Sequence, residues 1–140
     1  MADLQRILQI ERESFLAYAW PGDLFRHYAA ACPRLFLIAK VGRRIAGYSI
    51  TCVDRPGAEL VSIAVASRYR GHGIAKRLLR STLRKLEGAA VRTLWLTVRP
   101  KNGAAIRLYR GLGFVRRNTI HKYYEDGSDG LRMRLKIGPK

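Results

Sequence analysis

Two glycines flanked by basic residues occupy residues 70–76, which read Arg-Gly-His-Gly-Ile-Ala-Lys. An apolar run at residues 60–65 precedes the segment and a helical pattern of apolar residues at 74–87 follows it. The segment is therefore expected to join a strand to a helix. Glycines let a backbone approach a ligand, and the first turn of a helix offers N–H groups at the positive end of its dipole. The residue types predict a phosphate-binding loop, although an ordinary turn that binds nothing also contains them.

The spacing of this loop excludes two common nucleotide motifs. It lacks the Gly-x-x-x-x-Gly-Lys-[Ser/Thr] of a Walker loop and the Gly-x-Gly-x-x-Gly of a dinucleotide fold. It matches [Arg/Gln]-x-x-Gly-x-[Gly/Ala], with Arg70, Gly73 and Ala75 in the fixed positions. In this it resembles the GNAT superfamily of acyl-CoA N-acyltransferases, in which the loop wraps the pyrophosphate of acetyl-CoA.

The resemblance implies acetyl-CoA as the acyl donor and a set of residues that bind it. These residues are Ile63, Ala64, Val65, Arg70, Gly71, His72, Gly73, Ile74, Ala75, Lys76 and Asn102. Asn102 is also expected to cap the helix that follows it, and both roles can hold at once.

The resemblance can be narrowed to one group within the superfamily by four further segments, residues 94–102, 104–109, 111–114 and 123–129. They look like the corresponding segments of N-terminal protein acetyltransferases, including the bacterial ribosomal-protein-alanine N-acetyltransferases. The implied reaction is direct attack of a neutral amine on the thioester, without a covalent enzyme intermediate. Backbone N–H groups at residues 63–65 would stabilise the oxyanion.

Tyr109 matches the general acid of the family, which returns a proton to the departing thiolate. Its spacing alone would more often indicate packing between a helix and a sheet. The general base is less clear, because Thr97 stands where the ribosomal-protein enzymes have a glutamate. Glu59 matches the catalytic glutamate of histone-type GNAT enzymes, but it could equally be an exposed strand end. It lies about 13 Å along a strand from Ile63, so it is expected to act through a water chain.

Aromatic residues in two segments are candidates for binding the acceptor. Tyr123 and Tyr124 match tyrosines that hydrogen-bond the first backbone groups of a peptide, with cross-strand packing as the alternative. Phe15, Tyr18 and Trp20 lie in the link between two expected helices, which forms a wall of the acceptor cleft in GNAT enzymes. Packing in the core is the alternative for these three rings.

The absence of a glutamate at position 97 favours an acceptor that loses its proton easily. Presenting a neutral amine at pH 7 costs about 1 kcal/mol for an α-amino group, but about 4.6 kcal/mol for a lysine. A weak or distant base therefore suffices for a protein N-terminus and not for a lysine. Thr97 thus supports the same acceptor class as the resemblance.

The 140 residues, of which 48% are hydrophobic, are expected to form one GNAT domain over residues 1–140. Their periodicities predict, in order, helix, helix, three strands, helix, strand, helix and two strands. A GNAT domain has this order after an initial strand, so either that strand is missing or the true start lies upstream. The expected fold class is α/β (α+β), with a central mixed, mostly antiparallel sheet flanked by helices. The last two strands are expected at about 115–124 and 131–137.

The charge balance is strongly basic, with 27 Lys plus Arg against 10 Asp plus Glu, or +17. This charge attracts polyanions, so contact with a ribosome or RNA is expected in addition to contact with the phosphates of CoA.

Cys32 and Cys52 show no metal-type spacing and are expected to be reduced, buried thiols. The histidines form no ligand cluster, so no metal is expected. No apolar run or leader pattern indicates a membrane or export, so the prediction is a cytoplasmic protein.

Two other functions fit the same sequence. The chain could acetylate a small amine such as a polyamine, an aminoglycoside or an amino acid. It could instead be a catalytically weak module that binds acetyl-CoA and uses its basic surface to bind RNA or a ribosome. The missing glutamate at position 97 is what keeps this last alternative open.

Overall fold

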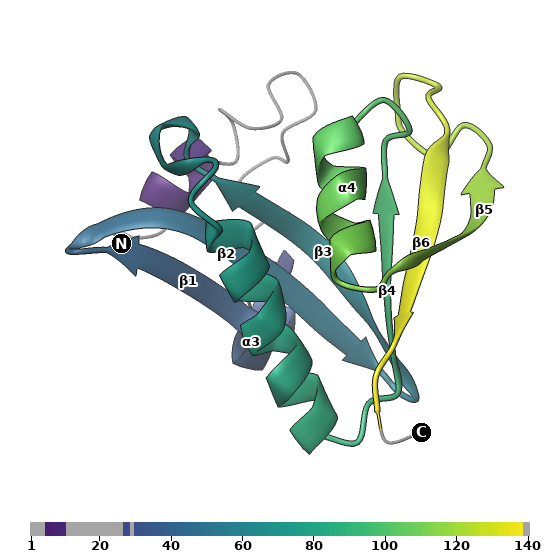
Figure 1. Cartoon of the computed structure of the whole chain (residues 1–140), viewed down its shortest axis with the longest axis horizontal. Coiled ribbons are helices and arrows are strands. Elements are labelled where there is room, and N and C mark those ends of the chain that lie inside the picture. Colours follow the sequence, from purple (N-terminus) through teal and green to yellow (C-terminus); the bar gives the residue numbers. More distant parts are fainter. Residues whose placement is uncertain (1–4, 11–26, 29, 139–140) are drawn as a thin grey trace. The chain divides into compact units, whose positions relative to one another are not determined.

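The computed structural model of the protein describes residues 5–10, 27–28 and 30–138 (Figure 1). Phe15, Tyr18 and Trp20, which were predicted to line the acceptor cleft, lie outside these residues. Among the described residues, no helix is both long and apolar enough to cross a membrane.

The described elements follow the predicted order. The strands and α-helices are β1 (Phe36–Val41), β2 (Arg44–Asp54), β3 (Gly57–Val65), α3 (Ile74–Gly88), β4 (Thr93–Val98), α4 (Gly103–Gly111), β5 (Val115–Ile120) and β6 (Gly130–Lys136). Two short 3-10 helices, η2 (Pro33–Leu35) and η3 (Ser67–Tyr69), precede β1 and follow β3, respectively. The strands hydrogen-bond in the order β1-β2-β3-β4-β6-β5. β3 and β4 are parallel, whereas β1 with β2, β4 with β6, and β5 with β6 are antiparallel. The predicted mixed, mostly antiparallel sheet with helices is confirmed.

The chain divides into two compact units. One comprises residues 1–52 and 61–85, and the other comprises residues 53–60 and 86–140. β3 contributes its second half to the first unit and its first half to the second.

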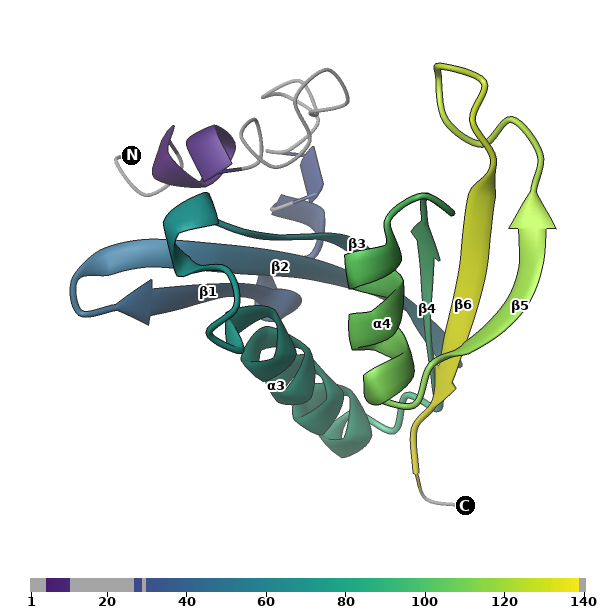
Figure 2. The same cartoon turned by 45° about the horizontal axis from the view of Figure 1, so that its top comes forward.

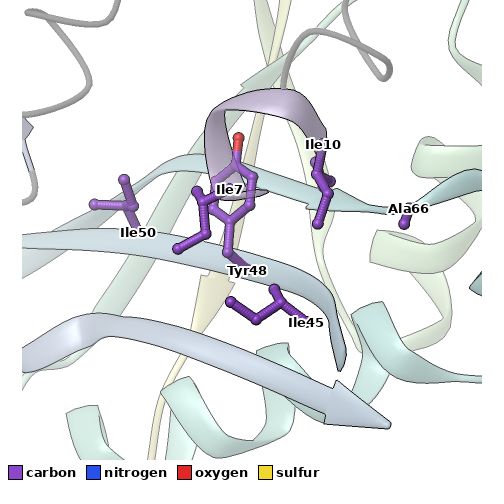
Figure 3. Packing of buried hydrophobic residues seen from close by; sticks show 7 residues of the cluster. Ile7, Ile10, Ile45, Tyr48, Ile50 and Ala66 are labelled. Carbon is purple, nitrogen blue, oxygen red and sulfur yellow. The ribbon is translucent and has the colours of Figure 1, made fainter. Parts of the chain in front are cut away.

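The core of the first unit lies between a short helical segment, residues 5–10, and β2. Ile7 and Ile10 of the helical segment pack on Tyr48 and its neighbours on β2 (Figure 3). The spacing of three residues places both isoleucines on one side of a helix. The Tyr48 hydroxyl lies 2.9 Å from Ser62 Oγ, so this buried phenol has a hydrogen-bond partner.

α3 packs on the same unit through its apolar side. Ile74 and Leu78 are buried against Ala46 of β2. Gly47 follows at a point where β3 comes very close, because a Cβ atom there would lie 2.8 Å from the carbonyl oxygen of Ala64. Any larger residue at position 47 would push β2 away from the strand that leads into the glycine loop.

Cys32 and Cys52 form a disulfide, with their Cα atoms 5.3 Å apart. The prediction of two reduced, unpaired thiols was therefore wrong. The two cysteines are 20 residues apart in sequence, and only the fold of the first unit brings them together. Spacing along the chain carries no sign of such a contact, and the cysteines lend no support to a cytoplasmic location.

In the second unit, α4 lies beside β4 and β6 (Figure 2). The side chains of β4 alternate, so that Leu94, Leu96 and Val98 are buried and the residues between them are half-buried. Asn102 caps α4, since its Oδ1 accepts a hydrogen bond from the amide of Ala105 at 3.2 Å. The predicted capping role of Asn102 is confirmed.

The strand after α4 is shorter than the sequence predicted. β5 ends at Ile120 instead of Tyr124, and residues 121–129 form a loop before β6. The carboxylate of Asp129 accepts the amide of Lys122 at 3.1 Å, across the base of this loop. The side chain of Asp129 therefore accepts the hydrogen bond from Lys122 N–H that β6 would have accepted if β5 had continued further.

Candidate active site

The glycine loop of the first unit adopts the conformation that its residue types predict. Gly71 and Gly73 have φ angles of +81° and +78°, which side chains of L-residues rarely tolerate. Among the residues that the structure describes, a Cβ at either position would meet no atom within 4 Å, so both glycines face open space there. α3 then begins at Ile74.

The amides of residues 71–76 are available to a ligand. In the part of the chain that the structure describes, none of these six N–H groups has a backbone acceptor. An anion supplies such acceptors at a helix N-terminus. The diphosphate that the resemblance implied is such an anion, and its binding by this loop stays a prediction.

Arg70 and His72 hold the loop to the residues before it. The Arg70 Nε donates to the Val65 carbonyl at 3.0 Å, and His72 Nδ1 lies 3.1 Å from the Tyr69 carbonyl oxygen. Lys76 is exposed on the first turn of α3. Ile63, Ala64 and Val65 precede the loop directly in β3 and lie in the same unit. The structure therefore brings together all predicted donor-binding residues except Asn102, which belongs to the second unit.

Glu59 is joined to Thr97 through Arg132 in the second unit. The Arg132 Nη1 and Nη2 donate to Glu59 Oε2 at 2.6 Å and Oε1 at 2.7 Å. Arg132 Nη1 also lies 3.1 Å from Thr97 Oγ1, to which it donates. The guanidinium lies over the ring of Trp95, 4.9 Å from the centroid. The sequence assigned no role to Arg132.

A shallow pocket of about 340 Å³ opens beside this group. Its lining residues are Asp54, Pro56, Gly57, Ala58, Glu59, Thr93, Trp95 and Arg132. Glu59 keeps 36% of its side chain exposed, and Arg132 keeps 23%. The carboxylate is thus held by an arginine and remains within reach of water.

Tyr109 is buried on α4, and its ring packs against Phe114 with centroids 5.7 Å apart. Burial, and to a lesser extent the nearby Tyr124, raise the pKa of Tyr109 well above its usual value of about 10. Burial is also the main cause that raises the pKa of Tyr124 to about 12. Both phenols therefore carry their protons near neutral pH and can donate hydrogen bonds.

Tyr123 and Thr97 meet at Gly130. A Cβ on Gly130 would lie 2.6 Å from Thr97 Cγ2 and 3.0 Å from Tyr123 Cγ. Tyr123 also makes an edge contact with Tyr124, with centroids 4.9 Å apart and planes at 87°. Tyr123 thus lies near Thr97, and Tyr124 lies near enough to Tyr109 to affect its pKa, all within the second unit.

Arg99 is a second arginine that the sequence left without a role. Its Cζ lies 3.8 Å from the centroid of the Tyr124 ring, and its Nη1 lies 3.2 Å from Asp126 Oδ2. Arg99 lies in segment 94–102, one of the segments that carry the resemblance. This position was the only feature of the sequence that could have indicated a role for Arg99. Arg132 had no such signal, because its contact with Thr97 follows from the register of β4 with β6.

The family model described as Acetyltransferase (GNAT) family matches residues 4–114. The chain belongs to this GNAT family. The predicted superfamily and the predicted class of enzyme, an N-acetyltransferase, are therefore confirmed.

Several GNAT relatives are similar over nearly the whole chain. The N-alpha-acetyltransferase RimI of Mycobacterium tuberculosis is 34% identical over 143 aligned residues, covering 98% of this chain and 89% of the relative. The ribosomal-protein-S18-alanine N-acetyltransferase from Escherichia coli is 33% identical, with a TM-score of 0.85 over 100% of this chain and 91% of that one. A chain of the NatC complex bound to Gag peptide and CoA is 26% identical, with a TM-score of 0.84 over 96% and 91%. The predicted likeness to N-terminal and ribosomal-protein-alanine acetyltransferases is confirmed.

Proposed function

We propose that this GNAT protein transfers acetyl from acetyl-CoA to the N-terminal α-amine of a protein. The observation that carries the acceptor class is the Glu59–Arg132–Thr97 group. Position 97 carries the hydroxyl of Thr97, and the carboxylate of this group, that of Glu59, is bonded to the guanidinium of Arg132. A base that must act through water suits an α-amine, whose deprotonation at pH 7 costs about 1 kcal/mol, better than a lysine at about 4.6 kcal/mol. The names of the similar relatives support the same acceptor.

The donor would be held by the glycine loop. The amides of residues 71–76, together with the positive end of α3, would bind its pyrophosphate, and Lys76 would add charge. Ile63, Ala64 and Val65 would pair with the pantetheine arm and supply oxyanion donors, and Asn102 would add a contact. CoA in the similar NatC structure supports this donor. The proposed transfer uses no metal.

Glu59 would accept the proton of the ammonium group through a water chain. A carboxylate has about four acceptor sites, so the two bonds from Arg132 leave two for water. Arg132 would keep the carboxylate in one orientation. Once neutral, the amine attacks the thioester carbon, and the C–S bond breaks as the tetrahedral intermediate collapses and the thiolate of CoA leaves. The second proton of the attacking nitrogen passes to water in the same step, which leaves the neutral amide.

Tyr109 would stabilise the departing thiolate. Its pKa lies well above that of a thiol, about 8.5, so complete proton transfer to sulfur is uphill in the free enzyme. The phenol is therefore best suited to donate a hydrogen bond while negative charge develops on sulfur, with the proton following as the product forms.

Tyr123 and Tyr124 would bind the first backbone groups of the acceptor. Tyr123 is 49% exposed, and so is available to a peptide. Phe15, Tyr18 and Trp20 remain proposed parts of the same cleft. The two compact units would act together as a single domain, and the cytoplasm, where acetyl-CoA and new protein N-termini occur, is the proposed location.

Turnover of acetyl-CoA with a panel of N-terminal peptides tests this function. We expect peptides with a free α-amine to be acetylated much faster than isomers whose only free amine is a lysine. Tyr109→Phe should lower kcat by about 10²-fold, the lower end of the range for acid–base groups. Equal rates for the isomeric peptides, or turnover only with small amines, would contradict the proposed acceptor. Tight CoA binding without turnover would identify a binding module.

A contact with RNA is proposed for the outer side of α3. Five exposed basic residues lie along it: Lys76, Arg77, Arg80, Arg84 and Lys85. In the described part of the chain, none of them forms an ion pair. Replacing Arg77, Arg80 and Arg84 by Gln should weaken binding to a ribosomal RNA fragment and reduce its dependence on salt. Unchanged binding would remove RNA as a partner of this surface.

A further inference from the structure

Arg99 connects the end of β4 to the loop that carries the proposed acceptor-binding tyrosines. Its guanidinium lies against the face of the Tyr124 ring, 3.8 Å from Cζ to the centroid. Its Nη1 lies 3.2 Å from Oδ2 and 3.4 Å from Oδ1 of Asp126, a residue 27 positions later in the chain. The side chains of Arg99 and Asp126 are only 24% and 32% exposed. The side chain of Arg99 thus contacts one aromatic ring of the loop, that of Tyr124, and one of its acidic residues, Asp126.

Asp126 passes this restraint on to the backbone of the loop. Its Oδ1 accepts the amide of Ser128 at 3.1 Å, and its Oδ2 accepts the Ser128 hydroxyl at 2.8 Å. The amide of Tyr124 donates to the Ser128 carbonyl at 3.1 Å, and the amide of Gly127 donates to the Tyr124 carbonyl at 2.9 Å. Residues 124–128 therefore form a closed turn that is fastened to Arg99 through Asp126.

The restraint also reaches Tyr123. With Arg99 on the face of Tyr124, the ring of Tyr123 makes a perpendicular contact with it at 4.9 Å. Tyr123 remains 49% exposed, so the turn presents this ring to solvent. Arg99, which follows β4, thus holds the ring of Tyr124 and through it the ring of Tyr123, and Tyr123 remains accessible to solvent.

We infer that Arg99 is a positioning residue, which holds the 121–129 loop in the form that binds the acceptor. This inference rests on the proposed function. Ordering a loop during binding costs free energy, and a loop that is already ordered avoids that cost. Arg99 touches none of the reacting groups in this scheme. Its removal should therefore weaken acceptor binding more than it slows acetyl transfer.

Arginine suits this role better than lysine. Its planar guanidinium can stack on an aromatic ring while its N–H groups donate to a carboxylate, whereas an ammonium is a point charge without a flat face. Arg99→Lys should therefore keep the attraction to Asp126 but lose the stacking on Tyr124. Arg99→Met should lose both interactions while keeping an unbranched apolar side chain.

The first test is steady-state kinetics on the full chain with a peptide that the wild-type protein acetylates. For Arg99→Met we expect the KM for the peptide to rise about tenfold, with kcat within about threefold and the KM for acetyl-CoA unchanged. Arg99→Lys should give an intermediate KM. Arg116→Met is the matched control, because Arg116 is exposed on β5 and the substitution removes the same charge. A wild-type peptide KM in Arg99→Met would overturn the inference.

The second test needs no turnover. Hydrogen exchange measured by mass spectrometry on a peptide that spans residues 121–129 reports the amides of Gly127 and Ser128. These amides should exchange faster in Arg99→Met and in Asp126→Asn than in wild type, and the double variant should be no faster than Arg99→Met. Arg116→Met should match wild type, and equal exchange in all variants would overturn the inference.

The two tests separate this inference from the function on which it rests. A wild-type protein that acetylates no peptide contradicts the proposed function, and the exchange data then decide alone whether Arg99 orders the loop. A wild-type protein that turns over peptides, together with an Arg99→Met variant that is unaltered in KM and exchange, contradicts only the role of Arg99.

Discussion

Arg132 donates to both carboxylate oxygens of Glu59, at 2.6 and 2.7 Å, although the two residues are 73 positions apart. This geometry is the side-by-side pairing that a planar guanidinium and a carboxylate favour. The same guanidinium also donates to Thr97 Oγ1, at the position where the resemblance had led us to expect a glutamate base. Glu59 is thus a carboxylate fixed near position 97 and not a free strand end.

Replacing Glu59 tests whether the fixed carboxylate takes the proton of the acceptor. Glu59→Gln keeps the size of the side chain but removes its basicity, so kcat with an α-amino peptide should fall by about 10²-fold. If Arg132 acts only by orienting Glu59, adding Arg132→Met to Glu59→Gln should cause little further loss in rate. Glu87→Gln, at an exposed carboxylate on α3, is the control and should keep the wild-type rate. Wild-type kcat in Glu59→Gln would exclude Glu59 as the base.

The raised pKa of Tyr109 should make folding less favourable at high pH. Above pH 10 the unfolded phenol loses its proton while the buried Tyr109 keeps it, because burial raises the folded pKa. The contribution to stability is complete below pH 10 and is lost as pH rises, at up to about 1.4 kcal/mol per pH unit. Urea unfolding from pH 8 to 12 should therefore show a shallower decline for Tyr109→Phe than for wild type. Parallel declines would mean that Tyr109 ionises as readily in the folded protein as in the unfolded chain.

Local patterns predicted the features that depend on neighbours in sequence. The apolar spacing of α3, the glycine conformations at 71 and 73, and the cap at Asn102 each involve residues within about one helical turn. The end of β5 was missed because Tyr123 and Tyr124 are residues that favour a strand. The competing bonds come from Asp126 and Asp129, which the strand pattern does not register.

Contacts that depend on strand register could not be predicted from the sequence. Arg132 reaches Thr97 because these residues are paired between β4 and β6, and a shift of one residue would turn Arg132 to the other face. The pairing of β5 with β6 also shifts in register between Arg116 and Asn118, and no residue type in this segment predicts the shift. The Cys32–Cys52 bond has the same origin, since it depends on where the fold places position 52.

Reducing the Cys32–Cys52 bond should destabilise the first unit. The bond closes a loop of 20 residues, and a cross-link of this span is expected to contribute about 3 kcal/mol by restricting the unfolded chain. The midpoint of thermal unfolding should therefore fall when a reductant is added. The double variant Cys32→Ser, Cys52→Ser should unfold at the lower temperature with or without reductant. An unchanged midpoint in the reduced wild-type protein would show that the bond adds no stability.

Gly73→Ala separates the backbone role of the glycine loop from its role in binding. A side chain at a φ of +78° costs about 1 to 2 kcal/mol, and the added Cβ would point into the space proposed for the pyrophosphate. Gly42→Ala is a matched control, because Gly42 has a φ of +61° and equally open surroundings in the turn between β1 and β2. Both variants should lose similar stability in urea, but only Gly73→Ala should lose affinity for CoA in calorimetry. If the two variants bind CoA equally well, the pyrophosphate is not held at Gly73.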